Sequence, residues 1–309
     1  MTLNILIDCD PGHDDAVAIL LANKLANLTS ITTVAGNTDL ANTTRNALAL
    51  VELLGTNIPV HSGAYQSLGG EVRDAQHVHG KTGFGGTDLP QPTTEVASED
   101  AVSHIIEQAR AIDDLWLVAV GPLTNIALAI EEYPAIVSRV AGLSIMGGST
   151  GSGNATPAAE FNIWADPEAA RTVLTAGLNP IICGLNLTQQ FLSDDDFVET
   201  LAAADQRVPS FIAELYTYMH ERMDAIVGER RAALHDPCAV LALTHPQLFE
   251  FEDMYVDVEL SGELTRGMTL FDQRRTHARN PANCRVATKI DAKKAREVLL
   301  STLLDNSST

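Results

Sequence analysis

The chain has 309 residues, of which 45% are hydrophobic and 19% are charged, a composition typical of a globular protein with a large core. Its 40 acidic and 20 basic residues give a formal net charge of −20, which argues against a nucleic-acid binder that relies on clustered Lys and Arg. No apolar run of about 18 residues and no basic segment before an apolar stretch is present, and the four cysteines form no CxxC pair, so we predict a cytoplasmic protein without a membrane span, disulfide framework or zinc knuckle.

Apolar runs of strand length alternate with helical patterns along the chain. The sequence predicts strands at residues 3–7, 31–35, 115–120, 140–146, 180–183 and 255–260. It predicts helices at residues 16–28, 43–54, 101–111, 126–132 and 167–176. This alternation is typical of repeated βα units, so we predict an α/β fold: one domain over residues 1–309, with a mainly parallel central sheet flanked by helices in a Rossmann-like open arrangement.

Four carboxylates follow the first predicted strand, at Asp8, Asp10, Asp14 and Asp15. Strand periodicity places Asp8 and Asp10 on one side of the strand, and the turn after them leads into a helix that begins near Asp14. Like charges this close either share a proton or bind a hard cation such as Ca²⁺ or Mg²⁺, and we favour the cation. The alternative is structural, because Asp14 and Asp15 also suit the N-terminal end of a helix.

Polar strings follow the next strands as well, at Gly36-Asn37, at residues 121–125 and at residues 146–148. Ligands of parallel α/β sheets bind at the carboxyl ends of the strands, so these strings are expected at one rim together with the acids.

Two later strings carry polar side chains. Glu160 and Asn162 stand two positions apart, which points both side chains the same way in an extended segment and suits the recognition of hydroxyl groups. Asp166 precedes Pro167 and is predicted to cap a helix. His235 and Asp236 also precede a proline and an apolar helix, where a cap with a surface imidazole is the simpler interpretation; if Asp236 faces Asp10 and Asp15, it becomes a metal ligand and His235 a proton donor.

Seven strings occur together in this chain: DCDPGHDD at 8–15, VAGN at 34–37, HGKTG at 79–83, GPLTNIA at 121–127, MGG at 146–148, EFN at 160–162 and HDP at 235–237. In this order and spacing, they make the chain resemble the inosine-uridine-preferring nucleoside hydrolases, a family of calcium-dependent N-ribohydrolases. The resemblance spans most of the chain. It implies hydrolysis of ribonucleosides to ribose and free base, with Ca²⁺ as the cofactor and a homodimer or homotetramer as the assembly.

The resemblance also implies roles for individual residues. Ca²⁺ would be held by Asp10, Asp15, Asp236 and the backbone carbonyl of Thr124, with Asp10 as general base on a bound water. Asn37 would help to place the reacting groups, and His235 would assist the departing base. Substrate contacts would come from Asp14, His79, Met146, Asn154, Glu160 and Asn162.

The preferred base stays open, because residues 215–234 diverge most from the family pattern. Tyr216, Tyr218, His220 and Arg222 are candidate base contacts, although an amphipathic surface helix explains them equally well. Two other functions are considered: a metal-dependent phosphohydrolase, which would need basic phosphate contacts, and a non-catalytic calcium-dependent binder of nucleosides or sugars. The retention of both Asp10 and His235 argues against a binder.

Overall fold

The computed structural model describes residues 2–87, 89–274 and 280–305. Its main feature is an eight-stranded sheet with strand order β3-β2-β1-β4-β5-β6-β12-β9, in which only β9 runs antiparallel to its neighbour. The first six positions have the order of a doubly wound nucleotide-binding sheet, which confirms the predicted α/β class. The strands are β1 (Asn4–Cys9), β2 (Asn27–Thr33), β3 (Val60–Ser62), β4 (Leu115–Ala119), β5 (Gly142–Met146), β6 (Ile181–Cys183), β9 (Phe249–Met254) and β12 (Cys284–Ile290).

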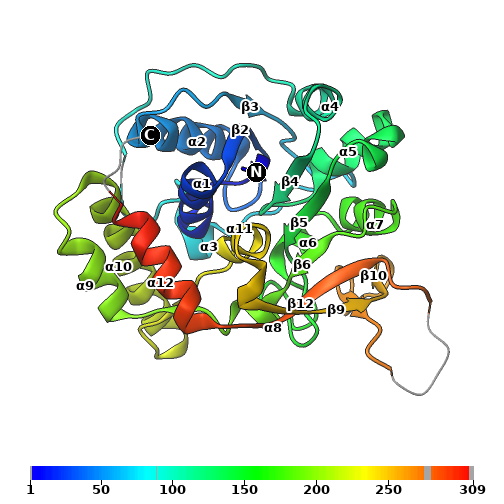
Figure 1. Cartoon of the computed structure of the whole chain (residues 1–309). Helices are drawn as coiled ribbons and strands as arrows, with labels where there is room; N and C mark the ends of the chain where they lie inside the picture. The colour runs from blue at the N-terminus through cyan, green and yellow to red at the C-terminus, as the bar shows by residue number, and fades with distance from the viewer. Residues whose placement is uncertain (1, 88, 275–279, 306–309) are drawn as a thin grey trace.

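Helices cover both faces of this sheet (Figure 1). One face carries α1 (His13–Leu25), α2 (Leu40–Leu54), α10 (Arg207–Val227), α11 (Pro237–Thr244) and α12 (Ala292–Leu303). The other face carries α4 (Ala101–Ala111), α5 (Thr124–Glu132) and α7 (Pro167–Thr175). The alternation along β1 supplies both layers, because Ile5 and Ile7 join the first core and Leu6 joins the second.

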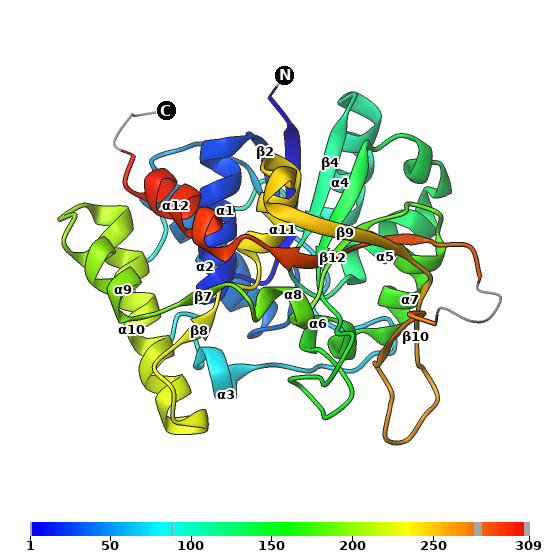
Figure 2. The same cartoon turned by 60° about the horizontal axis from the view of Figure 1, so that its bottom comes forward.

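Shorter elements complete the fold (Figure 2). The short helices α3, α6 and α8 lie at the same end of the sheet in this view. Their bounds, with those of the remaining elements, are α3 (Gln76–His79), α6 (Phe161–Ala165), α8 (Leu185–Thr188), α9 (Asp195–Ala202), the 3₁₀ helices Pro134–Ser138 and Pro246–Leu248, and the strand pairs β7 (Leu192–Ser193) with β8 (Ala232–Ala233) and β10 (Val256–Val258) with β11 (Thr269–Phe271).

Each predicted strand and helix has a counterpart, although several bounds shift: β2 spans Asn27–Thr33 rather than residues 31–35, and α1 begins at His13 rather than at residue 16. The first helix ends at Leu25 rather than at residue 28, because the chain already enters β2 at Asn27. The predicted strand at 255–260 exists as β10, but it pairs only with β11 and stays outside the central sheet. Within the described part of the chain, no helix is long and apolar enough to cross a bilayer.

Candidate active site

The candidate site lies where β1, β2 and β4 end. Asp10 follows β1, Asn37 follows β2, and Thr124 begins α5 after β4. β1 and β4 are neighbours in the sheet, although β2 and β3 separate them in sequence, so the direction of strand addition reverses there. Ligand sites of open α/β sheets form at such a reversal, at the carboxyl ends of the strands.

Asp10 is fully buried and held by Asn37. The backbone N–H of Asn37 donates to Asp10 Oδ2 at 2.6 Å, and its side-chain amide donates to the carbonyl of Asp10 at 3.0 Å. Gly36 makes this approach possible, since a β-carbon at residue 36 would overlap the carboxylate. The second oxygen, Oδ1, is buried without a hydrogen-bond partner among the described residues, so it is available to a ligand.

Asp15 closes the turn that connects β1 to α1. Its Oδ1 accepts from the N–H of Asp10 at 3.2 Å, and its Oδ2 accepts from the N–H of Gly12 at 2.9 Å. The side-chain amide of Asn37 also donates to this Oδ2 at 3.0 Å. Asn37 therefore orients both Asp10 and Asp15.

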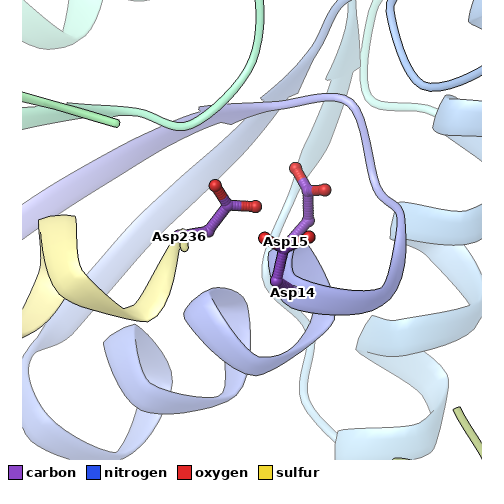
Figure 3. A group of neighbouring side chains, drawn as sticks. All are labelled: Asp14, Asp15 and Asp236. Atoms are coloured by element: carbon purple, nitrogen blue, oxygen red, sulfur yellow. The ribbon is translucent and has the colours of Figure 1, made fainter. Parts of the chain in front are cut away.

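Asp236 approaches this turn from the start of α11 (Figure 3). Carboxylate oxygens of Asp14, Asp15 and Asp236 all lie within 4.8 Å of one another. This convergence brings Asp236 to Asp15, as the prediction for the His-Asp string required in part, and it adds Asp14 to the group; the role of these acids as metal ligands stays a prediction. Three acids on two helix ends can hold a metal ion through oxygen ligands.

The electrostatics of the cluster favour a bound cation. Burial raises the pKa of Asp15 to about 7, and it raises the pKa values of Asp10 and Asp236 well above 3.8. The neighbouring carboxylates add to each shift, because each negative charge disfavours the next. A hard divalent cation would relieve this repulsion and would find the unpartnered Oδ1 of Asp10, so the residues fit such an ion.

Asp8 has a different environment from the one expected. Its Oδ1 accepts hydrogen bonds from Thr32 Oγ1 at 2.6 Å and from the side-chain amide of Asn125 at 2.8 Å. Burial raises the pKa of Asp8 to about 7. These bonds tie β1 to β2 and α5, so Asp8 supports the rim of the sheet, whereas Asp14 and Asp15 gather with Asp236.

Glu160 and Asn162 link the neighbouring loops. The carboxylate of Glu160 caps α6 by accepting from the N–H groups of Asn162 and Ile163, and it also accepts from the N–H of Gly148 at 2.9 Å. Burial raises its pKa to about 7. The amide of Asn162 donates to the carbonyls of Val120 and Met146, each at 3.1 Å. Both side chains thus fix the ends of β4 and β5, and their contact with a substrate stays a prediction.

Asn154 is exposed, in the loop that precedes α6. Its Oδ1 accepts from the N–H of Phe161 at 2.9 Å, which holds the loop close to α6.

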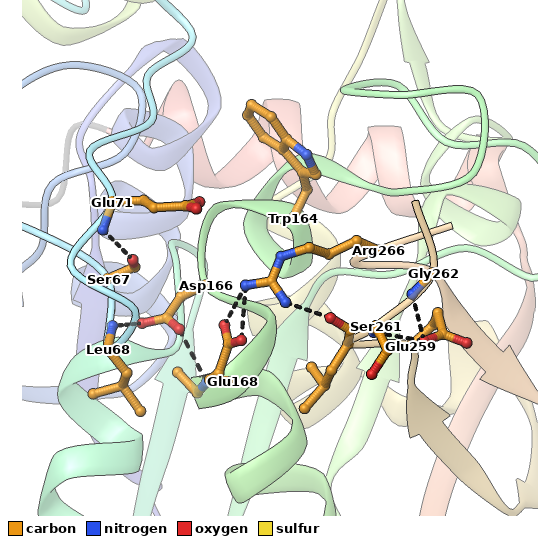
Figure 4. Close-up of polar contacts among 12 residues, drawn as sticks. Ser67, Leu68, Glu71, Trp164, Asp166, Glu168, Glu259, Ser261, Gly262 and Arg266 are labelled. Carbon is orange, nitrogen blue, oxygen red and sulfur yellow. Dashed lines mark hydrogen bonds and ion pairs between the residues drawn. The ribbon is translucent and has the colours of Figure 1, made fainter. Parts of the chain in front are cut away.

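Asp166 is confirmed as the cap of α7 (Figure 4). One carboxylate oxygen accepts from the N–H of Ala169, and the other accepts from the N–H of Leu68 and from Thr124 Oγ1.

Two histidines stand near the acids. His235 Nδ1 lies 2.7 Å from Thr188 Oγ1, and His79 Nδ1 lies 3.0 Å from the Nδ1 atom of His13. Burial lowers the pKa of His235 and lowers that of His79 to about 4, and the negative charge of Asp14 opposes both shifts. Both imidazoles are therefore neutral near pH 7 and can act as hydrogen-bond donors through one ring nitrogen.

The divergent segment forms most of α10. Tyr218 stacks on His13 with the ring centroids 5.5 Å apart, and Arg222 Nε donates to the carbonyl of His77 at 2.9 Å. These two residues therefore face the turn and the loop that carries His79. Tyr216 and His220 are buried instead, and His220 Nε2 lies 2.9 Å from Ser193 Oγ, so they belong to the packing of α10.

Sequence reasoning missed three supporting residues: His13, Asn46 and Thr188. The amide of Asn46 donates to the carbonyls of Pro11 and Thr82, at 2.9 and 2.7 Å, and so joins the acidic turn to the His79 loop. No local pattern reveals these partners, because each contact depends on the tertiary fold. For His13, its place inside the string of acids was the only available signal.

Comparisons with known proteins identify the family of this chain. Residues 5–297 match the family model described as inosine-uridine preferring nucleoside hydrolase. The pyrimidine-specific ribonucleoside hydrolase RihA of Shewanella sp. strain ANA-3 is 40% identical over 308 residues, which cover 98% of this chain and 96% of that protein.

Solved structures give the same result. A plant nucleoside hydrolase, the PpNRh1 enzyme, superposes with a TM-score of 0.93 at 31% identity and covers 98% of this chain and 99% of its own. The purine-preferring ribonucleoside hydrolase of Gardnerella vaginalis has a TM-score of 0.91 at 27% identity, with 97% and 98% of the two chains covered. The chain therefore belongs to the inosine-uridine preferring nucleoside hydrolase family and is a ribonucleoside hydrolase.

Proposed function

We propose that this enzyme hydrolyses the N-glycosidic bond of pyrimidine ribonucleosides, with Asp10 as general base and Ca²⁺ as cofactor. The observation that carries this proposal is the carboxylate of Asp10: one oxygen is fixed by Asn37, and the other is buried and unpartnered. A carboxylate held in this way can receive a proton at a defined position.

Ca²⁺ would be held by Asp10, Asp15, Asp236 and the backbone carbonyl of Thr124. This set is oxygen-only, as a hard cation requires. The chemistry that Ca²⁺ supplies when bound is neutralisation of the cluster and polarisation of a water molecule. Asp14, whose carboxylate lies within 4.8 Å of Asp15 and Asp236, is assigned to the ribose.

Hydrolysis of the N-glycosidic bond passes through a transition state in which the ribosyl group has oxocarbenium character. Nearby carboxylates stabilise the positive charge of this group. Asp10 takes a proton from the attacking water while the acids around it offset the positive charge of the sugar. Asn154, Glu160 and Asn162 are assigned to ribose contacts, and Met146 to the pocket wall. Attack on the face opposite the base inverts the anomeric carbon.

The departing base accumulates negative charge and needs a hydrogen-bond donor. His235 and His79 are assigned this task, because both lie close to Asp14 and both are neutral near pH 7. The relatives support the choice of a pyrimidine base: the RihA protein named above is described as pyrimidine-specific at 40% identity, whereas the purine-preferring enzyme is 27% identical.

The test is a panel of cytidine, uridine, inosine and adenosine, with release of ribose and free base measured in the presence of Ca²⁺. We expect kcat/KM for uridine or cytidine to exceed that for both purines by at least about 10-fold, a difference of about 1.4 kcal/mol in transition-state binding. A higher kcat/KM for inosine or adenosine would overturn the base preference.

Asp10→Asn tests the role of Asp10 as the general base. The asparagine can still accept from Asn37, so the fold is kept, while the base is lost and kcat should fall by roughly 100-fold or more. Asp253→Asn, on the exposed side of β9, is the matched substitution and should leave kcat unchanged. Phosphate release from a nucleotide without base release would instead support the phosphohydrolase, and binding without turnover would support the non-catalytic binder.

A further inference from the structure

Two histidine rings meet beside the acidic cluster. His13 is the first residue of α1, and His79 is the last residue of α3. Their Nδ1 atoms lie 3.0 Å apart, and their ring centroids lie 5.1 Å apart. Two bare ring nitrogens would repel at this distance, so one of the two Nδ1 atoms must carry a proton and donate it to the other.

The burial of His13 decides which ring donates. Its Nε2 atom is buried and has no hydrogen-bond partner among the described residues. If His13 accepted at Nδ1, its own proton would sit on Nε2 as a buried N–H group without an acceptor, which is rare in native proteins. A neutral imidazole has one N–H. If His13 donates from Nδ1, that N–H is satisfied, and only the acceptor Nε2 stays without a partner among the described residues.

His79 is placed differently. It is only partly buried, and its environment includes the negative charge of Asp14 and the imidazoles of His235 and His77. When His79 accepts at Nδ1, its proton must be on Nε2. His79 Nε2 is not among the buried, unpartnered side-chain atoms of the described residues, so a proton on this atom does not create a buried N–H without an acceptor.

Neighbours pack against both rings of the pair. The ring of Tyr218 is parallel to that of His13, with 5° between the planes. Gly12 leaves room for His79, since a β-carbon there would lie 2.6 Å from His79 Nδ1. Gly85 leaves room for Tyr218 in the same way, because a β-carbon at residue 85 would overlap its ring. The three rings therefore pack closely against one another and against the two glycines.

We infer that His13 is a positioning residue that fixes His79 in the Nε2–H tautomer. His79 then presents a hydrogen-bond donor to the site rather than an acceptor. Its partner would be an atom on which negative charge develops, such as a carbonyl oxygen of the departing base. This last step rests on the proposed function, whereas the tautomer itself does not.

The tautomer is measured directly in the free protein by long-range ¹H–¹⁵N correlation spectra of ¹⁵N-labelled histidine at pH 7.5. His79→Asn identifies the signals of His79 by their loss, and His104→Asn, at a remote histidine, serves as the control. We expect the pattern of a protonated Nε2 and a bare Nδ1 for His79. The opposite pattern in the unsubstituted protein would overturn the inference without any variant having to fold.

Two substitutions of His13 separate a positioning role from simple packing. His13→Leu removes the donor, so the Nε2–H state of His79 should no longer be fixed and kcat should fall by roughly 10-fold or more. His13→Asn retains an N–H in the place of Nδ1–H and should restore both the NMR pattern and most of kcat. An unchanged His79 tautomer in folded His13→Leu would contradict the inference. If the spectra agree but no nucleoside is hydrolysed, only the proposed function fails.

Discussion

Gly121 lies against the unpartnered oxygen of Asp10: a β-carbon at residue 121 would be 2.7 Å from Asp10 Oδ1. Together with Gly36 on the other oxygen, it leaves a narrow slot for the side chain of Asp10. The slot joins the ends of three neighbouring strands, so the position of the proposed base depends on the register of the sheet.

Gly121→Ala should displace the carboxylate of Asp10 by several tenths of an ångström. Because misplacement of a catalytic group by about 1 Å can cost roughly 100-fold in rate, we expect kcat to fall by about 10- to 100-fold. The measurement is steady-state kinetics with uridine, beside a thermal unfolding curve. Gly69→Ala, whose new β-carbon would make only ordinary contacts, is the matched control. Equal kcat values for the two variants would show that the slot is not needed.

Ca²⁺ should stabilise the enzyme more at pH 8 than at pH 5. In the absence of the ion, burial and neighbouring acids raise the pKa of Asp15 from 3.8 to about 7, so the folded state retains protons that the unfolded state releases. The free energy of unfolding of chelated protein therefore falls as the pH rises from about 4 through about 7. Ca²⁺ binds the deprotonated acids, so it offsets this fall in the free energy of unfolding at high pH. At a concentration 100-fold above its Kd, the ion adds about 2.7 kcal/mol to the free energy of unfolding.

The measurement is Tm with EGTA and with excess Ca²⁺ at both pH values. Asp15→Asn should abolish most of the Ca²⁺-induced shift, whereas Asp253→Asn should retain it. A shift of equal size at pH 5 and pH 8 would contradict the assignment of these acids as ligands.

His235→Ala should reduce hydrolysis of uridine more than hydrolysis of a riboside with an activated leaving group. The activated group departs without a donor, so the loss of His235 should cost roughly 100-fold in kcat for uridine and much less for the activated substrate. Thr188→Val removes the hydroxyl 2.7 Å from His235 Nδ1 and should give a smaller loss with the same substrate dependence. An equal loss of kcat on both substrates would show that His235 is not the hydrogen-bond donor to the departing base.

Asn46→Ala should loosen the loop that carries His79. The substitution removes the donor from the carbonyl of Pro11 and leaves the carbonyl of Thr82 with only the 3.4 Å bond from Arg45, at a cost of about 1–3 kcal/mol in the free energy of unfolding. We expect a lower midpoint in urea unfolding and a higher KM for uridine. Asn42→Ala, one turn earlier on α2 and more exposed, is the comparison and should change both values less.

Much of the fold was predictable because βα units leave a strong periodic signal. The apolar runs that became β1, β4 and β5 and the helices between them follow directly from it. β9 and β12 were not predicted, since their alternation with Glu, Arg and Lys resembles that of a surface segment. Periodicity also assigns no partner to a strand, which is why residues 255–260 were placed with the main sheet although Val256–Val258 pairs elsewhere.

The sequence likewise predicted some residues of the site and not others. Asp10, Asp15 and Asp236 were identified from their chemistry and from the family resemblance, and the structure brings Asp236 to the acidic turn. The residues that orient the site could not be predicted from the sequence. The bond from Asn125 to Asp8 and the contact of His13 with His79 both join residues far apart in sequence. Such contacts arise from the order of strands in the sheet, which no local pattern encodes.

The late position of Asp236 has a consequence for synthesis. During synthesis, Asp14 and Asp15 leave the ribosome early. Helix α11 emerges only after six strands of the central sheet. A nascent chain that stops before α11 therefore has an unfinished cluster with one acid fewer. Under the proposed function, such a product could not bind the ion through Asp236, so it would lack the stabilisation that the ion contributes and would be more exposed to proteolysis.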